Sequence, residues 1–181
     1  SERNGGNVRL KTVVDEDFVN FRMPSMLIGT ASCGGKCCIE AGIPLSVCQN
    51  DVWRESATVE VADEDLYDRF LLNPLTNAIV FGGLEPLEQQ DELLAFIRGL
   101  RHGRQCVSPV VIYTGYNRDE VQNFVEAVSK ETNIIMKFGR YIPNRPSVCD
   151  PVLGVTLASD NQYGTIVSTN NTEVLYELEH S

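Results

Sequence analysis

The sequence has few basic residues and no long apolar run. Lysine and arginine number 15 against 25 aspartates and glutamates, which gives a net charge of −10. Proteins that bind nucleic acids through the phosphates usually show the opposite balance, so we expect no direct nucleic-acid partner. No stretch of about 18 apolar residues occurs, so no membrane-spanning helix is expected. The chain also opens without the pattern of a secretion signal, and we therefore expect a cytoplasmic protein.

Internal repeats, low-complexity stretches and obvious linkers are also absent. A length of 181 residues with 43% apolar content suits one domain with a substantial core. We therefore expect a single domain over residues 1–181. The chain begins with a serine rather than a methionine, so we expect Ser1–Gly6 to be disordered or derived from a cleaved expression tag.

Short apolar runs alternate with amphipathic helical segments along the chain. The first two runs, Val8–Val14 and Phe18–Arg22, flank an acidic turn and predict a small hairpin. Further runs predict strands at Ser25–Thr30, Ala78–Phe81, Val110–Tyr113 and Ile134–Phe138, with Val152–Leu157 as another candidate. Helices are expected near Asp63–Leu72, from Pro86 to just before Gly103, and after the cap formed by Asn117 and Glu120.

Strands that alternate with helices indicate βαβ units and a parallel sheet. A complete eight-unit barrel needs about 200 residues or more, and this chain has room for only about five or six units. We therefore predict an α/β fold, a single-domain partial β/α barrel. Sites in such folds lie beyond the carboxyl ends of the strands. The segments after Thr30, Phe81 and Tyr113 should therefore meet at one mouth.

Four of the six cysteines, Cys33, Cys37, Cys38 and Cys48, are clustered between residues 33 and 48. A domain of this size without a secretion signal does not need disulfides, so the clustered thiols favour metal or cluster binding. Adjacent side chains of an extended chain point in opposite directions, so Cys37 and Cys38 should not both ligate one centre. Three thiolates on a four-iron cluster leave one iron open, whereas four would indicate electron transfer or a structural zinc. The zinc site remains an alternative.

The segment Phe81–Pro86 (FGGLEP) resembles the Gly-Gly-Glu-Pro element of radical S-adenosylmethionine (SAM) proteins. Three further segments resemble the activating protein of anaerobic (class III) ribonucleotide reductase. These are residues 111–116 (VIYTGY), 138–141 (FGRY) and 158–162 (ASDNQ). The resemblance runs in order from about Val13 to Ile166, and that family is a compact, incomplete barrel of about this length.

The resemblance implies a [4Fe–4S] cluster held by Cys33, Cys37 and Cys48, with SAM bound at the open iron. The residues implied for SAM are Gly82, Gly83, Glu85, Thr114, Lys137 and Asn161. Among them, Glu85 would meet the SAM ammonium and Lys137 could neutralise its carboxylate. One electron from a flavodoxin- or ferredoxin-type reductant would cleave SAM to methionine and a 5′-deoxyadenosyl radical. That radical would remove hydrogen from a glycine of a partner enzyme, such as anaerobic ribonucleotide reductase.

Two features depart from the family pattern. The family motif is Cys-x3-Cys-x2-Cys, whereas ten residues separate Cys37 from Cys48 here, and Leu84 is an extra residue in the Gly-Gly-Glu-Pro element. Two alternatives therefore remain. One is a radical SAM enzyme that acts on a small molecule or a peptide. The other is an iron–sulfur or zinc-binding module without catalytic activity.

Overall fold

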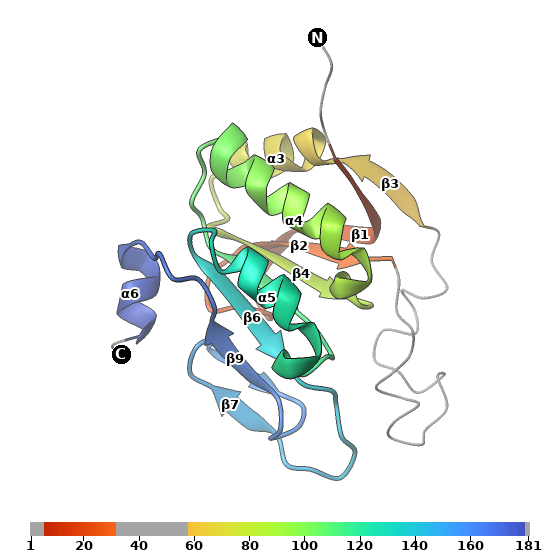
Figure 1. The fold of residues 1–181 in the computed structure, drawn as a ribbon, viewed down its shortest axis with the longest axis vertical. Coiled ribbons are helices and arrows are strands. Elements are labelled where there is room, and N and C mark those ends of the chain that lie inside the picture. The colour runs from red at the N-terminus through yellow and green to blue at the C-terminus, as the bar shows by residue number, and fades with distance from the viewer. Residues whose placement is uncertain (1–5, 32–57, 180–181) are drawn as a thin grey trace.

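The structure of the chain, a computed structural model, describes residues 6–31 and 58–179 (Figure 1). Its main sheet has seven strands: β1 (Asn7–Asp17), β2 (Ser25–Thr30), β3 (Val59–Ala62), β4 (Ala78–Gly83), β5 (Val110–Tyr113), β6 (Ile134–Phe138) and β9 (Tyr163–Ile166). The short strands β7 (Val148–Asp150) and β8 (Val155–Leu157) form a separate hairpin. The helices are α3 (Asp63–Leu71), α4 (Gln90–Arg98), α5 (Gln122–Val128) and α6 (Glu173–Glu179).

The centre of the main sheet is parallel and both of its flanks are antiparallel. The strand order is β3-β1-β2-β4-β5-β6-β9. Strands β2, β4, β5 and β6 pair in parallel, whereas β1 pairs antiparallel with β2 and with β3, and β9 pairs antiparallel with β6. Strands β2 and β6 are buried along their whole length, which explains why these runs are almost continuously apolar.

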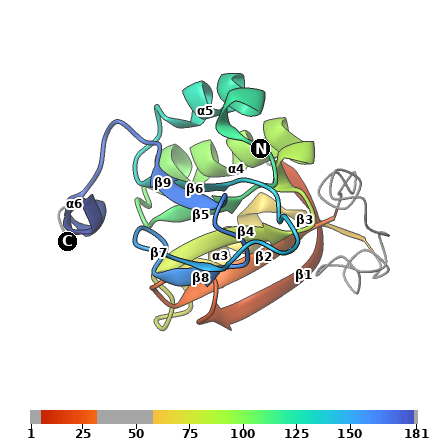
Figure 2. The ribbon, with the colours of Figure 1, turned by 90° about the horizontal axis from the view of Figure 1, so that it is seen from below.

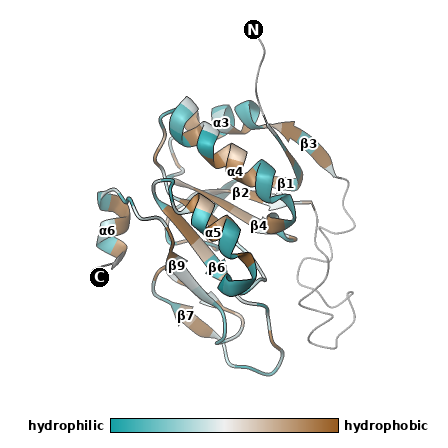
Figure 3. Ribbon diagram, in the orientation of Figure 1, coloured by the Kyte–Doolittle hydropathy of each residue, from teal (hydrophilic) through white to brown (hydrophobic). Residues whose placement is uncertain are grey.

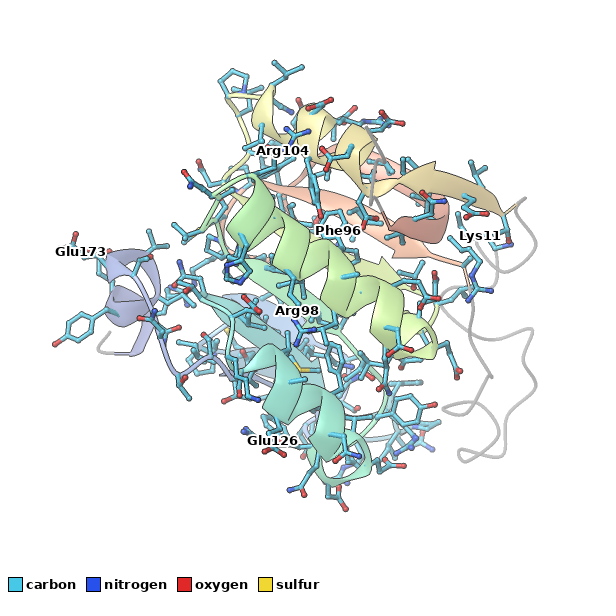
Figure 4. All side chains as sticks on the ribbon, turned by 45° about the horizontal axis from the view of Figure 1, so that its top comes forward. Lys11, Phe96, Arg98, Arg104, Glu126 and Glu173 are labelled. Atoms are coloured by element: carbon cyan, nitrogen blue, oxygen red, sulfur yellow. The ribbon has the colours of Figure 1, made fainter. Side chains whose placement is uncertain are left out.

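Helices α4 and α5 cover one face of the sheet (Figure 2). Phe96 on α4, labelled in Figure 4, is fully buried, and its ring packs edge-on against Phe81 of β4 at 5.1 Å between centroids. Hydrophilic and hydrophobic residues alternate along both helices (Figure 3). Amphipathic helices of this kind bury one apolar stripe against a sheet. Within the described parts of the chain, every helix is too short or too polar to cross a bilayer.

A second apolar cluster fills the opposite face of the sheet. Leu27, Val80 and Val111 point from the strands to this side, where they are buried with Leu153 and Leu157. Leu157 belongs to the β7–β8 hairpin, which lies on the side of the sheet away from α4 and α5 (Figure 2). The sheet is therefore the middle layer of a three-layer arrangement.

These findings correct the predicted partial β/α barrel. The sheet is mixed, both of its faces are covered, and β6 is followed by the β7–β8 hairpin rather than by a crossover helix. Apolar runs show where strands lie but do not show their direction, because an antiparallel strand has the same composition. The prediction therefore treated the strands after the N-terminal hairpin as parts of βαβ units.

The predicted N-terminal hairpin is also wrong. Residues Asp15–Asp17 continue β1 instead of forming a turn, and Asp17 pairs with Ser25 of β2. Two of these acidic side chains are hydrogen-bonded by α3 and the loop after it. Arg69 of α3 donates a hydrogen bond to Asp15, and Asn73 Nδ2 donates to Glu16 Oε1 at 2.8 Å. The turn starts after Asp17, where Asp17 Oδ2 accepts a hydrogen bond from the Asn20 amide at 3.1 Å.

Candidate functional site

The carboxyl ends of the parallel strands lie along one edge of the sheet. Thr30, the last residue of β2, pairs with Gly83 of β4, and the Thr30 hydroxyl donates to the Gly82 carbonyl at 3.1 Å. The Thr114 amide, just after β5, donates to the carbonyl of Lys137 on β6 at 2.9 Å. We call the implied SAM residues at this edge the strand-end site: Gly82, Gly83, Glu85, Thr114, Lys137 and Asn161.

Gly83 ends β4 in a conformation that favours glycine. Its φ of 83° lies in the left-handed region, where a side chain is strained. The chain then turns through Glu85 into a short 3-10 turn, Pro86–Gln89, with the proline at its first position. After this turn, the Glu85 side chain lies within hydrogen-bond distance of Thr114 and Gly115, which directly follow β5.

Glu85 connects the loop after β4 to the loop after β5. Its side chain is buried, and Oε2 accepts from the Leu87 amide at 2.9 Å while Oε1 accepts from the Gly115 amide at 2.7 Å. The Thr114 hydroxyl lies 3.0 Å from both oxygens. Burial raises the pKa of Glu85, and these donors together with the positive charge of Lys137 oppose that rise. The carboxylate is thus oriented by several groups of this chain.

Lys137 adds a buried positive charge beside Glu85. Its Nζ atom donates to the Gly139 carbonyl at 2.7 Å and lies 3.4 Å from the Thr114 carbonyl. Gly139 has a φ of 100°, and its amide donates to the Tyr116 carbonyl at 3.0 Å. Lys137 therefore bonds the backbone at the ends of both β5 and β6.

Asn161 approaches the same edge from the loop before β9. Its Nδ2 group donates to the Arg140 carbonyl at 2.7 Å. Its Oδ1 atom is buried and has no hydrogen-bond partner within the described residues. A buried acceptor without a partner is costly, and such an atom is often satisfied by a ligand or by water.

Charged and aromatic side chains outside the predicted SAM set lie next to the strand-end site, and the contacts among them were not predicted. Arg140 forms an ion pair with Glu120 at 2.8 Å and lies 5.8 Å from the centre of the Tyr116 ring. The Tyr116 hydroxyl in turn donates to Glu88 at 3.2 Å. These residues are far apart along the chain, so no local pattern could have predicted their contacts.

The predicted cluster ligands Cys33, Cys37 and Cys48 lie outside the described residues, as does Cys38. Between residues 6–31 and 58–179, no group of three or more histidine, cysteine, aspartate or glutamate side chains could hold a metal ion. In that part of the chain Cys106 is half-buried and Cys149 is exposed, and both are free thiols.

Of the predicted SAM residues, the structure thus connects Glu85, Thr114 and Lys137 through hydrogen bonds. Gly82 and Gly83 lie at the end of β4, where they pair with β2, and Asn161 bonds the Arg140 carbonyl. Comparisons with protein-family models, with curated proteins and with solved structures give no match for this chain. The resemblance to radical SAM proteins therefore rests on the sequence motifs alone.

Proposed function

We propose that this chain is a radical SAM enzyme that binds SAM at the strand-end site and a [4Fe–4S] cluster through Cys33, Cys37 and Cys48. The observation that carries the proposal is the convergence of the motif residues at the carboxyl edge of four parallel strands. Strand β2 ends there at Thr30, three residues before Cys33 in the sequence. Ligand sites in sheets with parallel strands typically lie at this edge.

The chemistry of the strand-end site suits the methionine half of SAM, which has an ammonium and a carboxylate. Gly82 and Gly83 leave room for close approach to the backbone. Lys137 and Arg140 supply positive charge for a carboxylate, and the buried Asn161 Oδ1 is an acceptor for a donor group of a ligand. The described residues therefore fit SAM, and the cluster is proposed from the cysteine spacing.

When bound, the cluster and SAM would supply the radical chemistry. One electron from a flavodoxin- or ferredoxin-type reductant would cleave SAM to methionine and a 5′-deoxyadenosyl radical, which would take a hydrogen atom from a substrate. The protein binds and orients SAM. Lys137 offsets the carboxylate charge, and the buried strand ends exclude water. The hydrogen donor that we propose is a glycine of a partner enzyme, such as anaerobic ribonucleotide reductase.

The test of this proposal is anaerobic reconstitution with iron and sulfide. We expect about four irons and about four sulfides per chain. The variants Cys33→Ala, Cys37→Ala and Cys48→Ala should each lose the cluster, whereas Cys38→Ala should keep most of it. Cys149→Ala is the matched control, because Cys149 is an exposed free thiol far from this segment in the sequence. One zinc per chain and no brown chromophore would contradict the proposal and favour a zinc-binding module.

A further inference from the structure

The orientation of Glu85 does not suit direct contact with a ligand ammonium. Both of its carboxylate oxygens accept hydrogen bonds inside the protein, from the Leu87 amide, the Gly115 amide and the Thr114 hydroxyl. Only 8% of the residue is exposed. A carboxylate with several donors at this depth is already solvated by the protein, so a ligand would have to displace an existing bond to reach it.

The three donors belong to two loops that follow neighbouring strands. Leu87 lies in the 3-10 turn after β4, whereas Thr114 and Gly115 directly follow β5. The Thr114 hydroxyl also accepts a hydrogen bond from the Tyr116 amide at 3.1 Å, so the bonding continues into the β5 loop. Glu85 thus fixes how far apart the two loops lie and how each one faces the strand-end site.

Glutamine cannot reproduce this arrangement. Donors approach both oxygens of Glu85, and glutamine would replace one oxygen with an NH2 group that faces another donor. The negative charge beside Lys137 would also be lost, although Lys137 would keep its bonds to the Gly139 and Thr114 carbonyls.

We infer that Glu85 is a positioning residue that holds the loops after β4 and β5 in the arrangement that binds SAM, and does not itself contact the SAM ammonium. This inference rests on the proposed function for its consequence in SAM binding. The contacts among Glu85, Leu87, Thr114 and Gly115 are independent of any ligand. Substituting Glu85 should therefore change the protein before SAM is added.

The experiment compares variants in two arms. In the first arm, the protein without cluster or SAM is labelled with ¹⁵N, and the amide resonances of Leu87 and Gly115 are recorded together with the melting temperature. In the second arm, SAM is titrated into the reconstituted protein. The variants are Glu85→Gln, Thr114→Val and Thr114→Ser. Glu92→Gln is the matched control, since Glu92 is an exposed glutamate on α4.

In the first arm, Glu85→Gln should move both amide resonances upfield and lower the melting temperature by about 5–10 °C, because charged hydrogen bonds are lost. Thr114→Val should give a smaller change in the same direction, and Thr114→Ser should restore the wild-type values because it keeps the hydroxyl. Glu92→Gln should change neither quantity.

In the second arm, Glu85→Gln should weaken SAM binding about tenfold to a hundredfold. Thr114→Val should also weaken it, and Thr114→Ser should rescue it. If Glu85→Gln fails to fold, the two Thr114 variants decide the question alone. Equal SAM affinities of Thr114→Val and Thr114→Ser would then overturn the inference.

Two other outcomes would overturn it as well. Weaker SAM binding by Glu85→Gln with unmoved Leu87 and Gly115 resonances would show that Glu85 contacts SAM directly. Moved resonances with unchanged SAM affinity would show that the loop arrangement does not affect binding. A wild-type protein that binds no SAM would instead refute the proposed function, and the first arm alone would still show whether Glu85 holds the two loops.

Discussion

The two ends of the central strands β4, β5 and β6 each contain a buried charged side chain that bonds backbone groups. At the carboxyl end, Glu85 accepts from the amides of Leu87 and Gly115. At the amino end, Arg101 donates to the carbonyls of Thr132, Cys106 and Asn133 at 2.7, 2.9 and 3.2 Å. Arg101 follows α4 in a π-helical turn, Gly99–Gly103. Burial lowers its pKa to about 10.

Two asparagines, one at each end of these strands, differ in how completely their amide groups are bonded. Asn133 at the amino end uses its whole amide group: Nδ2 donates to Val107 and Thr172, and Oδ1 accepts from the Thr172 amide. Asn161 at the carboxyl end leaves its buried Oδ1 without a described partner. The amide group of Asn133 is therefore fully bonded, whereas Asn161 keeps one buried acceptor. Thr76 Oγ1, just before β4 at the amino end, is also buried without a described partner.

The largest expected effect is at the amino end. Arg101→Met should lower the free energy of unfolding by about 3–5 kcal/mol, because three carbonyls lose a charged donor. Urea denaturation of the protein without cofactors measures this. The control Arg98→Met removes an arginine of α4 (labelled in Figure 4) whose side chain is 52% exposed and should cost less than about 1 kcal/mol. Equal losses in the two variants would break the distinction between structural and surface arginines.

A pair of glycine substitutions sharpens the comparison. Gly139→Ala should destabilise the protein by about 2 kcal/mol, because φ is 100° and the new Cβ would lie 3.0 Å from the Asn161 carbonyl oxygen. It should also weaken SAM binding, since Asn161 must move. Gly103→Ala, near the amino end, meets no atom within 4 Å and should be neutral or slightly stabilising. Melting temperatures and SAM titrations of both variants check this, and an unaltered SAM affinity in Gly139→Ala would contradict the role of Asn161.

A smaller effect is expected from the pH dependence of Asp63, at the start of α3. Burial, and then the negative charge of Glu64, raise the pKa of Asp63 from 3.8 to about 6. The protonated carboxyl is therefore favoured in the folded state. The stability that the protonated Asp63 carboxyl contributes is fully present below about pH 3.8 and is lost as the pH rises through about 6.

Asp63→Asn should therefore be more stable than the wild type above about pH 6, and the difference should vanish near pH 4. Melting temperatures recorded across this range test the prediction. An advantage of the variant that is constant with pH would show that the carboxyl is not protonated in the fold.

The smallest effect is expected for Asp15→Asn. The ion pair of Asp15 with Arg69 is about half exposed on both sides, and such pairs contribute about 0.2–1 kcal/mol. The difference in unfolding free energy should shrink further in high salt. A loss of unfolding free energy comparable to that of Arg101→Met would contradict this prediction. It would show that the exposed ion pair stabilises β1 as strongly as the buried Arg101 stabilises the amino end of the central strands.

Local patterns in the sequence predicted the central strands and the cap of Asn117 with Glu120, and the structure confirms them. They did not predict β3 or β9, whose four-residue runs are short and partly exposed. The parallel direction of β2, β4, β5 and β6 was predicted correctly, but the antiparallel pairing of β3 and β9 was not, because pairing partners lie far apart along the chain. The Phe81–Pro86 motif marked Glu85 correctly as a residue of the edge, but its bonds to Thr114 and Gly115 span about 30 positions and have no local signal.

The most direct test of the central claim is release of 5′-deoxyadenosine by the reconstituted, reduced protein in the presence of SAM. We predict that the wild type forms 5′-deoxyadenosine and methionine in equal amounts. Gly83→Val should keep the cluster and lose this activity, because Gly83 has a φ of 83° at the strand-end site. A protein that carries a [4Fe–4S] cluster and releases no 5′-deoxyadenosine would contradict the account and leave a cluster-binding module without SAM chemistry.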